Sequence, residues 1–224
     1  MTPGAVTADV ALAAMADDVH GHLRHAARLI VGITGPPGVG KSTAARRLVD
    51  RLGAVASYLP MDGFHLATPQ LERLGRRDRR GAPDTFDVDG YVATLARIAA
   101  GYGARDVYVP DFERALGEPV AAALVVPAVA RVVVTEGNYL ALWEEARERL
   151  DRIYYLDGDR AVRRSRLIAR HVEGGRSEVD AQRWADEVDG ANAERIAATR
   201  DRCDRVFDVV DPATTPAPPS TGRR

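Results

Sequence analysis

The stretch GITGPPGVGKST, Gly32 to Thr43, decides the organisation of this chain. Within it, residues 35–42 satisfy the pattern GxxxxGK[ST]. The apolar run LIVGIT at 29–34 precedes the pattern, and residues 42–52 follow it with apolar side chains at helical spacing. A buried strand, a glycine-rich turn and a helix in this order predict a loop whose backbone N–H groups bind phosphate.

Lys41 is the single lysine of a chain that otherwise uses arginine as its basic residue. A compact ammonium on a flexible stem fits inside a phosphate-binding loop, whereas a wide guanidinium would displace the phosphate. Lys41 is expected to reach the β and γ phosphates of ATP, and the Ser42 hydroxyl to coordinate Mg²⁺. The residues expected to contact the nucleotide here are Gly35, Pro36, Pro37, Gly38, Val39, Gly40, Lys41, Ser42 and Thr43.

Composition favours a single domain, expected to span residues 1–211, in a chain of 224 residues with 46% hydrophobic residues. The net charge of −1 argues against a broad nucleic-acid surface, and no apolar run approaches the roughly 20 residues of a membrane span. One cysteine, Cys203, and an amino-terminal segment without a basic leader indicate a cytoplasmic protein. The tail at 212–224 is expected to be disordered, and a homodimer is compatible with the sequence.

Apolar runs alternate with helical patterns along the chain, which predicts an α/β fold with a doubly wound parallel sheet. The expected strands are 29–34, 54–59, 124–126, 132–135, 153–156 and 206–210, and the expected helices are 42–52, 91–100, 143–150, 159–171 and 177–200. Asp62 follows the second strand and should emerge at the carboxyl end of the sheet, where such folds bind ligands.

Further motifs follow the loop in a set order: MDGFH at 61–65, GAPDTFD at 81–87, VPDF at 109–112, VVVTEGNYLAL at 132–142 and an arginine-rich helix. Together they resemble the P-loop kinases that include uridine kinase, phosphoribulokinase and bacterial pantothenate kinase. The resemblance covers most of the segment between residues 29 and 210. It implies a P-loop NTPase kinase fold with a small arginine-rich helical lid at about 159–180.

The resemblance assigns Asp62 as the catalytic base and Glu136 as an acid near the metal and the acceptor. An aspartate after a strand also commonly caps a turn, and a glutamate at a strand end is often solvated. Asp84 matches a residue that binds substrate hydroxyls, but it could equally begin the helix at 91–100. His65 falls where some relatives contact the substrate, although a lone histidine is more often an ordinary packed residue.

Arg163, Arg166 and Arg170 recur at i, i+3 and i+7, so they share one helix face. In the family such arginines lie on a lid over the transferred phosphoryl group, which implies nucleotide contacts for Arg163 and catalytic roles for Arg166 and Arg170, with Arg170 also near the substrate. The alternative is a solvated, salt-bridged face. Asn192 resembles a position close to the nucleotide base.

Uridine kinases carry a tyrosine before the DF of VPDF, and this chain has Pro110 there, which makes uridine a poor candidate. We therefore expect an ATP- and Mg²⁺-dependent kinase acting on a hydroxyl of a small metabolite, such as pantothenate, a nucleoside or a sugar. One alternative is a P-loop ATPase or nucleotide switch that acts on a protein partner. A second is an enzyme that acts on nucleic acid, which the near-neutral charge disfavours.

Overall fold

The computed structural model describes residues 4–210, and the tail expected at 212–224 lies outside them. The strands are β1 (Val6–Thr7), β2 (Leu29–Thr34), β3 (Ala56–Pro60), β4 (Val107–Glu113), β5 (Glu118–Val126), β6 (Val132–Glu136), β7 (Arg152–Gly158) and β8 (Arg205–Val210). The helices are α1 (Ala8–Leu23), α2 (Lys41–Leu52), α3 (Thr68–Arg73), α4 (Val88–Gly101), α5 (Glu144–Arg147), α6 (Arg160–Glu173), α7 (Glu178–Trp184) and α8 (Gly190–Ala197).

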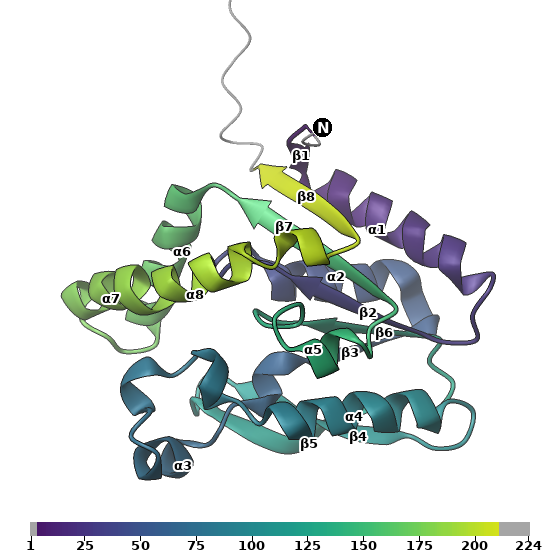
Figure 1. Ribbon diagram of the computed structural model, residues 1–224, viewed down its shortest axis with the longest axis horizontal. Coiled ribbons are helices and arrows are strands. Elements are labelled where there is room, and N and C mark those ends of the chain that lie inside the picture. Colours follow the sequence, from purple (N-terminus) through teal and green to yellow (C-terminus); the bar gives the residue numbers. More distant parts are fainter. Residues whose placement is uncertain (1–3, 211–224) are drawn as a thin grey trace, which may run out of the picture.

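Six strands form one parallel sheet in the order β1-β8-β7-β2-β6-β3, which confirms the predicted α/β architecture. Alternate residues of its central strands enter separate cores on the two faces. Val31 and Ile33 of β2 pack with α1 and α2, whereas Ile30 packs with α4 and β4. Helices therefore cover both faces, as Figure 1 shows, with α6, α7 and α8 grouped at one end of the sheet.

The predicted strand at 124–126 belongs to β5, which pairs with β4 in a separate antiparallel hairpin. Only residues 114–117 connect the two strands, and so short a connection cannot return the chain for parallel pairing. The expectation that this run lies in the parallel sheet was therefore wrong. The hairpin lies beside α4 and contributes Val107, Val109 and Val126 to the second core.

Two predicted helices differ in extent from the observed ones. The helix expected at 143–150 is the short α5, and the one expected at 177–200 is divided into α7, a π-helical turn at Ala185–Asp189, and α8. The sequence patterns also left α1 and α3 unassigned. Helix α1 packs on the first core, where Ala11, Leu12 and Met15 are buried.

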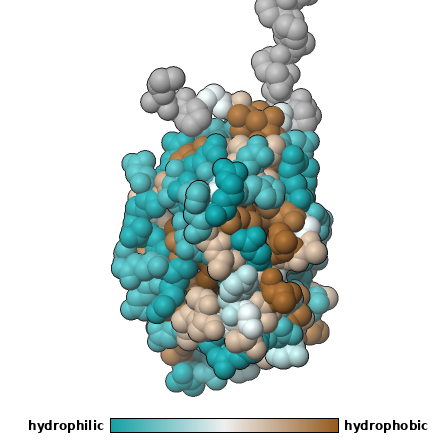
Figure 2. All heavy atoms as spheres, turned by 90° about the vertical axis from the view of Figure 1, so that its right-hand side faces the viewer, coloured by the Kyte–Doolittle hydropathy of each residue, from teal (hydrophilic) through white to brown (hydrophobic). Residues whose placement is uncertain are grey.

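No helix within residues 4–210 is long and apolar enough to cross a membrane. On the side of the molecule that lies to the right in Figure 1, hydrophilic and apolar residues are interspersed (Figure 2).

Candidate active site

The phosphate-binding loop between β2 and α2 is shaped by glycines with positive φ, which are Gly35 (147°), Gly38 (79°) and Gly40 (97°). A Cβ at Gly35 would lie 2.1 Å from the Leu156 carbonyl oxygen, and one at Gly38 would lie 2.6 Å from the Arg163 carbonyl oxygen. Both neighbours are backbone atoms, so they cannot swing away. The loop is thus fitted against β7 and α6, and it presents its backbone N–H groups at the N-terminus of α2.

Lys41 is buried, and its Nζ donates hydrogen bonds to the carbonyl oxygens of Gly35 (2.9 Å) and Pro36 (3.1 Å). Burial lowers the pKa of Lys41 to about 8, although the carboxylates of Glu136 and Asp62 act in the opposite direction. The ammonium therefore lies inside the loop, near two carboxylates.

The arginines of α6 divide between two positions. Arg163 and Arg170 also lower the pKa of Lys41, which places both guanidiniums within electrostatic reach of the ammonium. Arg166 lies along the loop instead, with Nη1 3.5 Å from the Gly38 carbonyl oxygen. Arg164 pairs with Asp186 and so belongs to a different face of α6.

Glu136 ends β6, and register pairs it with Ile33 of β2 and with Pro60 of β3. Its side chain is buried and accepts hydrogen bonds from the Tyr58 hydroxyl, at 2.8 Å, and from Ser42. Burial and the neighbouring Asp62 carboxylate raise the pKa of Glu136. The alternative of a solvated strand-end acid is therefore wrong.

Asp62 lies in the 3₁₀ turn Met61–Phe64 that follows β3, half-buried at the carboxyl end of the sheet. The His65 ring lies 4.0 Å from the Phe86 ring and 5.0 Å from the Phe112 ring, measured between centroids. Its Nδ1 is 2.8 Å from the Asp62 carbonyl oxygen, and because a carbonyl can only accept, Nδ1 carries the proton. Burial lowers the pKa of His65, which favours the neutral ring with Nε2 as a hydrogen-bond acceptor.

Asp84 does not begin a helix, so that alternative was wrong. Its carboxylate pairs with Arg79 and, at 3.4 Å, with Arg76. Asp87 caps α4 instead, because its side chain accepts a hydrogen bond from the Gly90 N–H. The pair with two arginines holds Asp84 at the surface of the 81–87 loop.

Asn192 is buried on α8, and its amide donates to the Gly81 carbonyl oxygen at 3.3 Å. The Tyr139 hydroxyl donates to the same carbonyl. Both side chains therefore hold the start of the 81–87 loop through the Gly81 carbonyl group. Asn192 therefore lies beside the loop that carries Asp84. The resemblance implied a position close to the nucleotide base, and that role stays a prediction.

Tyr58 is a site residue that the sequence patterns did not single out. Burial and the Glu136 carboxylate raise the pKa of its hydroxyl, which keeps it a hydrogen-bond donor. The Arg46 guanidinium lies 4.5 Å from the Tyr58 ring centroid. In a strand, neighbouring side chains point to opposite faces, so a strand at this position predicts that Tyr58 faces away from Ser57 and Leu59. The sequence does not predict that Tyr58 contacts Glu136, which lies 78 positions later.

The oxygen donors at this site suit Mg²⁺. Ser42 and Glu136 are hydrogen-bonded to each other, and Asp62 lies within electrostatic reach of Glu136. Within residues 4–210, no group of three or more His, Cys, Asp or Glu side chains could hold a metal. This pattern fits a magnesium ion held by one or two carboxylates together with substrate phosphates, because Mg²⁺ is seldom enclosed by protein alone.

Comparison with known proteins agrees with this geometry. The phosphoribulokinase/uridine kinase family model matches residues 30–215, and the chain belongs to that family. A Schizosaccharomyces pombe protein provisionally named uridine kinase C227.14 is 35% identical over 68% of this chain and 70% of its own length. The Escherichia coli protein YggC is 31% identical over 82% of this chain and 79% of its own length.

The crystal structure of a Silicibacter sp. TM1040 protein, provisionally named fructose transport system kinase, aligns with this chain with a TM-score of 0.78 and 34% identity. The alignment covers 88% of this chain and 98% of that one. A D-glycerate 3-kinase from Cryptococcus neoformans shares the fold with a TM-score of 0.66, at 14% identity over 90% of this chain and 95% of that one. The protein is thus a P-loop kinase of the class that transfers phosphoryl groups to small molecules.

Proposed function

We propose that this protein transfers the γ-phosphoryl group of ATP to a hydroxyl of a small metabolite. The observation that carries the proposal is that Asp62, Glu136 and Lys41 lie within electrostatic reach of one another at the carboxyl end of the sheet. A nucleotide switch needs the lysine and an acid for the metal. A second carboxylate beside them, on its own turn, adds a group that can take a proton from an acceptor hydroxyl.

Each residue has a distinct task in this proposal. Bound ATP would supply the phosphoryl group, and Mg²⁺ would neutralise charge on the phosphate oxygens. Asp62 orients the acceptor hydroxyl and takes its proton on a carboxylate oxygen. Lys41 and Arg170 stabilise negative charge on the transferred group, while Ser42 and Glu136 provide the oxygen ligands for the metal.

The acceptor side is formed by Asp62, His65 and the 81–87 loop. His65 packs against the Phe86 and Phe112 rings and offers an uncharged Nε2 acceptor, which suits a hydroxyl donor on a partly apolar molecule. The relatives include a uridine kinase from Leuconostoc citreum, a protein provisionally named fructose transport system kinase, and a D-glycerate 3-kinase. All three names describe molecules with free hydroxyls, and we propose a polyhydroxy acceptor of this kind.

A coupled ADP-release screen tests the proposal. The purified protein is incubated with ATP and Mg²⁺ and challenged with sugars, glycerate, nucleosides and pantothenate. We expect at least one compound to accelerate ADP release and to gain a phosphate by mass spectrometry. ATP hydrolysis that no metabolite accelerates, but that a protein partner stimulates, would instead favour a nucleotide-dependent switch.

A further inference from the structure

A cavity of about 300 Å³ lies between α1 and the phosphate-binding loop, away from the carboxylates of the proposed acceptor side. The first half of α1 supplies one wall, through Ala8, Ala11, Leu12 and Met15. The opposite wall comes from the loop and from the first turns of α2, and Arg166 and Val209 complete the lining. The volume is at the lower end of the range for small-ligand sites.

The cavity continues directly from the loop that holds the phosphates. Gly40 and Thr43 line it, and a Cβ built at Gly40 meets no atom within 4 Å, so the space beside this residue is open. Lys41 and Ser42, which face the carboxylates, are not part of the lining. A triphosphate bound along the loop would therefore have its γ end near Lys41 and its other end near Thr43.

The chemistry of the lining suits a flat heteroaromatic ring. Most of the wall is apolar, as small-ligand sites commonly are, and three polar side chains interrupt it. These are Thr43, Arg47 and Arg166. A guanidinium can stack on the face of an aromatic ring, and the apolar wall of α1 would cover the other face.

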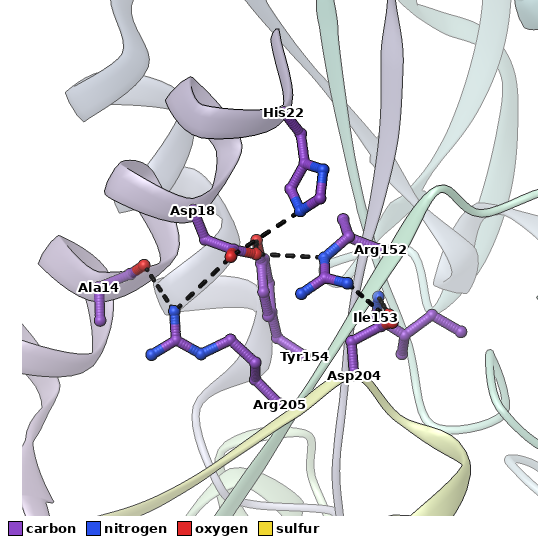
Figure 3. Close-up of polar contacts among 8 residues, drawn as sticks. All are labelled: Ala14, Asp18, His22, Arg152, Ile153, Tyr154, Asp204 and Arg205. Carbon is purple, nitrogen blue, oxygen red and sulfur yellow. Dashed lines mark hydrogen bonds and ion pairs between the residues drawn. The ribbon is translucent and has the colours of Figure 1, made fainter. Parts of the chain in front are cut away.

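Polar contacts attach α1 to the neighbouring strands of the sheet, as Figure 3 shows. Asp18 accepts hydrogen bonds from the Tyr154 hydroxyl (2.7 Å) and from Arg152 Nε (3.1 Å). Arg205 Nη1 lies 3.8 Å from the same carboxylate and 3.2 Å from the Ala14 carbonyl oxygen. These contacts tie α1 to β7 and β8, although the helix precedes residues 30–215 that the family model matches.

We propose that α1 forms one wall of the site for the nucleoside part of the phosphate donor. Helix α1, which precedes the residues that the family model matches, thereby positions the base of ATP and selects among nucleotides. This inference rests on the proposed function in one respect, which is that the donor is a nucleoside triphosphate bound at the loop.

The test compares ATP with inorganic tripolyphosphate, which has the phosphates but no nucleoside. Ala11→Leu narrows the cavity from α1, and Ala13→Leu makes the same change on the same helix at a position outside the lining. Binding of both ligands is measured by calorimetry with Mg²⁺, and folding by thermal unfolding. We expect Ala11→Leu to weaken ATP binding by about tenfold or more and tripolyphosphate by less than about twofold, with Ala13→Leu changing neither.

Ala8→Trp repeats the test at an exposed lining position if Ala11→Leu does not fold, with the exposed Val10→Trp as its control. Equal loss of both ligands would mean that the loop was distorted, and unchanged ATP binding would mean that α1 does not touch the nucleoside; either result overturns the inference. A wild-type protein that binds ATP no better than tripolyphosphate also overturns it while the loop keeps its role. A wild-type protein that binds neither ligand overturns the proposed function as well.

Discussion

Lys41 combines a buried position, a pKa lowered to about 8 and hydrogen bonds to the loop's own carbonyl groups. In the structure these carbonyl oxygens accept hydrogen bonds from the ammonium. Phosphate oxygens would take over this role, because they carry negative charge and form stronger hydrogen bonds. Phosphate binding by residue 41 therefore depends on both the size and the charge of its side chain.

Lys41→Arg should lower turnover by about a hundredfold, because the larger guanidinium must occupy space that the phosphate needs. Steady-state kinetics with the acceptor from the screen measure the loss, and Lys41→Ala provides the reference for complete removal of the charge. An arginine variant with near-normal activity would show that charge alone matters at this position.

Binding of ATP to the free protein should weaken as the pH rises above about 8. The ammonium is the form that binds the triphosphate, and a bound polyanion raises its pKa, so affinity is highest below pH 8 and falls by about tenfold per unit above it. Calorimetry between pH 7 and 9.5 measures this.

The single lysine allows a direct check. With ¹³C-labelled lysine the protein gives one side-chain signal set, so its titration follows Lys41 without assignment. A midpoint near 10.5, the ordinary value for lysine, together with pH-independent ATP binding, would contradict the prediction.

Asp62→Asn should lower phosphoryl transfer by about a hundredfold to ten-thousandfold, because asparagine keeps the shape of the side chain but cannot accept a proton. Affinity for ATP should change little, since the loop determines it. Turnover is compared at saturating ATP with whichever compound stimulates ADP release. If the variant retains more than about a third of wild-type turnover, Asp62 is not the base.

Helix α6 presents its arginines in more than one direction. Arg163 and Arg170 act on Lys41, whereas Arg166 lines the cavity beside α1 and Arg164 pairs with Asp186. Asp159 caps the N-terminus of the helix, because its side chain accepts a hydrogen bond from the Val162 N–H. This cap fixes the residue at which the helix starts. One element can thus contact both ends of a bound nucleotide.

Arg170→Ala should lower kcat by about a hundredfold and raise the KM for ATP much less, because a lid arginine meets charge chiefly in the transition state. Arg166→Ala should do the reverse and act mainly on the KM for ATP. Arg164→Ala is the matched control on the same helix. Identical kinetics in all three variants would indicate that this helix is only a solvated face.

At the scale of the whole molecule, two cores enclose the sheet, and polar contacts join segments that lie far apart in the sequence. Asp18 of α1 meets Arg152, Tyr154 and Arg205, which belong to the last two strands (Figure 3). Burial raises the pKa of Asp18, but the hydrogen bond from Tyr154 and the nearby arginines outweigh it, so the pKa is lowered in the folded protein.

Asp18→Asn should reduce the free energy of unfolding by about 1–3 kcal/mol, because it leaves a partly buried arginine without its counter-charge. A lowered pKa means that the contribution is present at neutral pH and is lost as the pH falls through the acidic range. Urea unfolding at pH 7 measures the difference. Asp17→Asn, at the exposed neighbouring position, is the control, and an equal effect in both variants would contradict the prediction.

The sequence by itself determined the phosphate-binding loop, the parallel sheet and the positions of Asp62 and Glu136. These features depend on local patterns: glycines where φ is positive, apolar runs that become strands, and acids directly after strands. Because the carboxyl ends of parallel strands share one edge, the sequence places Asp62 and Glu136 at the same edge of the sheet, and the pairing of β3 with β6 in the structure makes them neighbours.

Only the tertiary structure decided which side chains complete the site. Tyr58 meets Glu136 through strand register, Asn192 fastens the 81–87 loop through packing of α8, and α1 lies beside the loop because Asp18 binds to strands β7 and β8. Such contacts join residues far apart in the sequence, and the widest of them, between Asp18 and Arg205, spans 187 positions. They follow from how whole elements pack, and no short segment of sequence contains both partners.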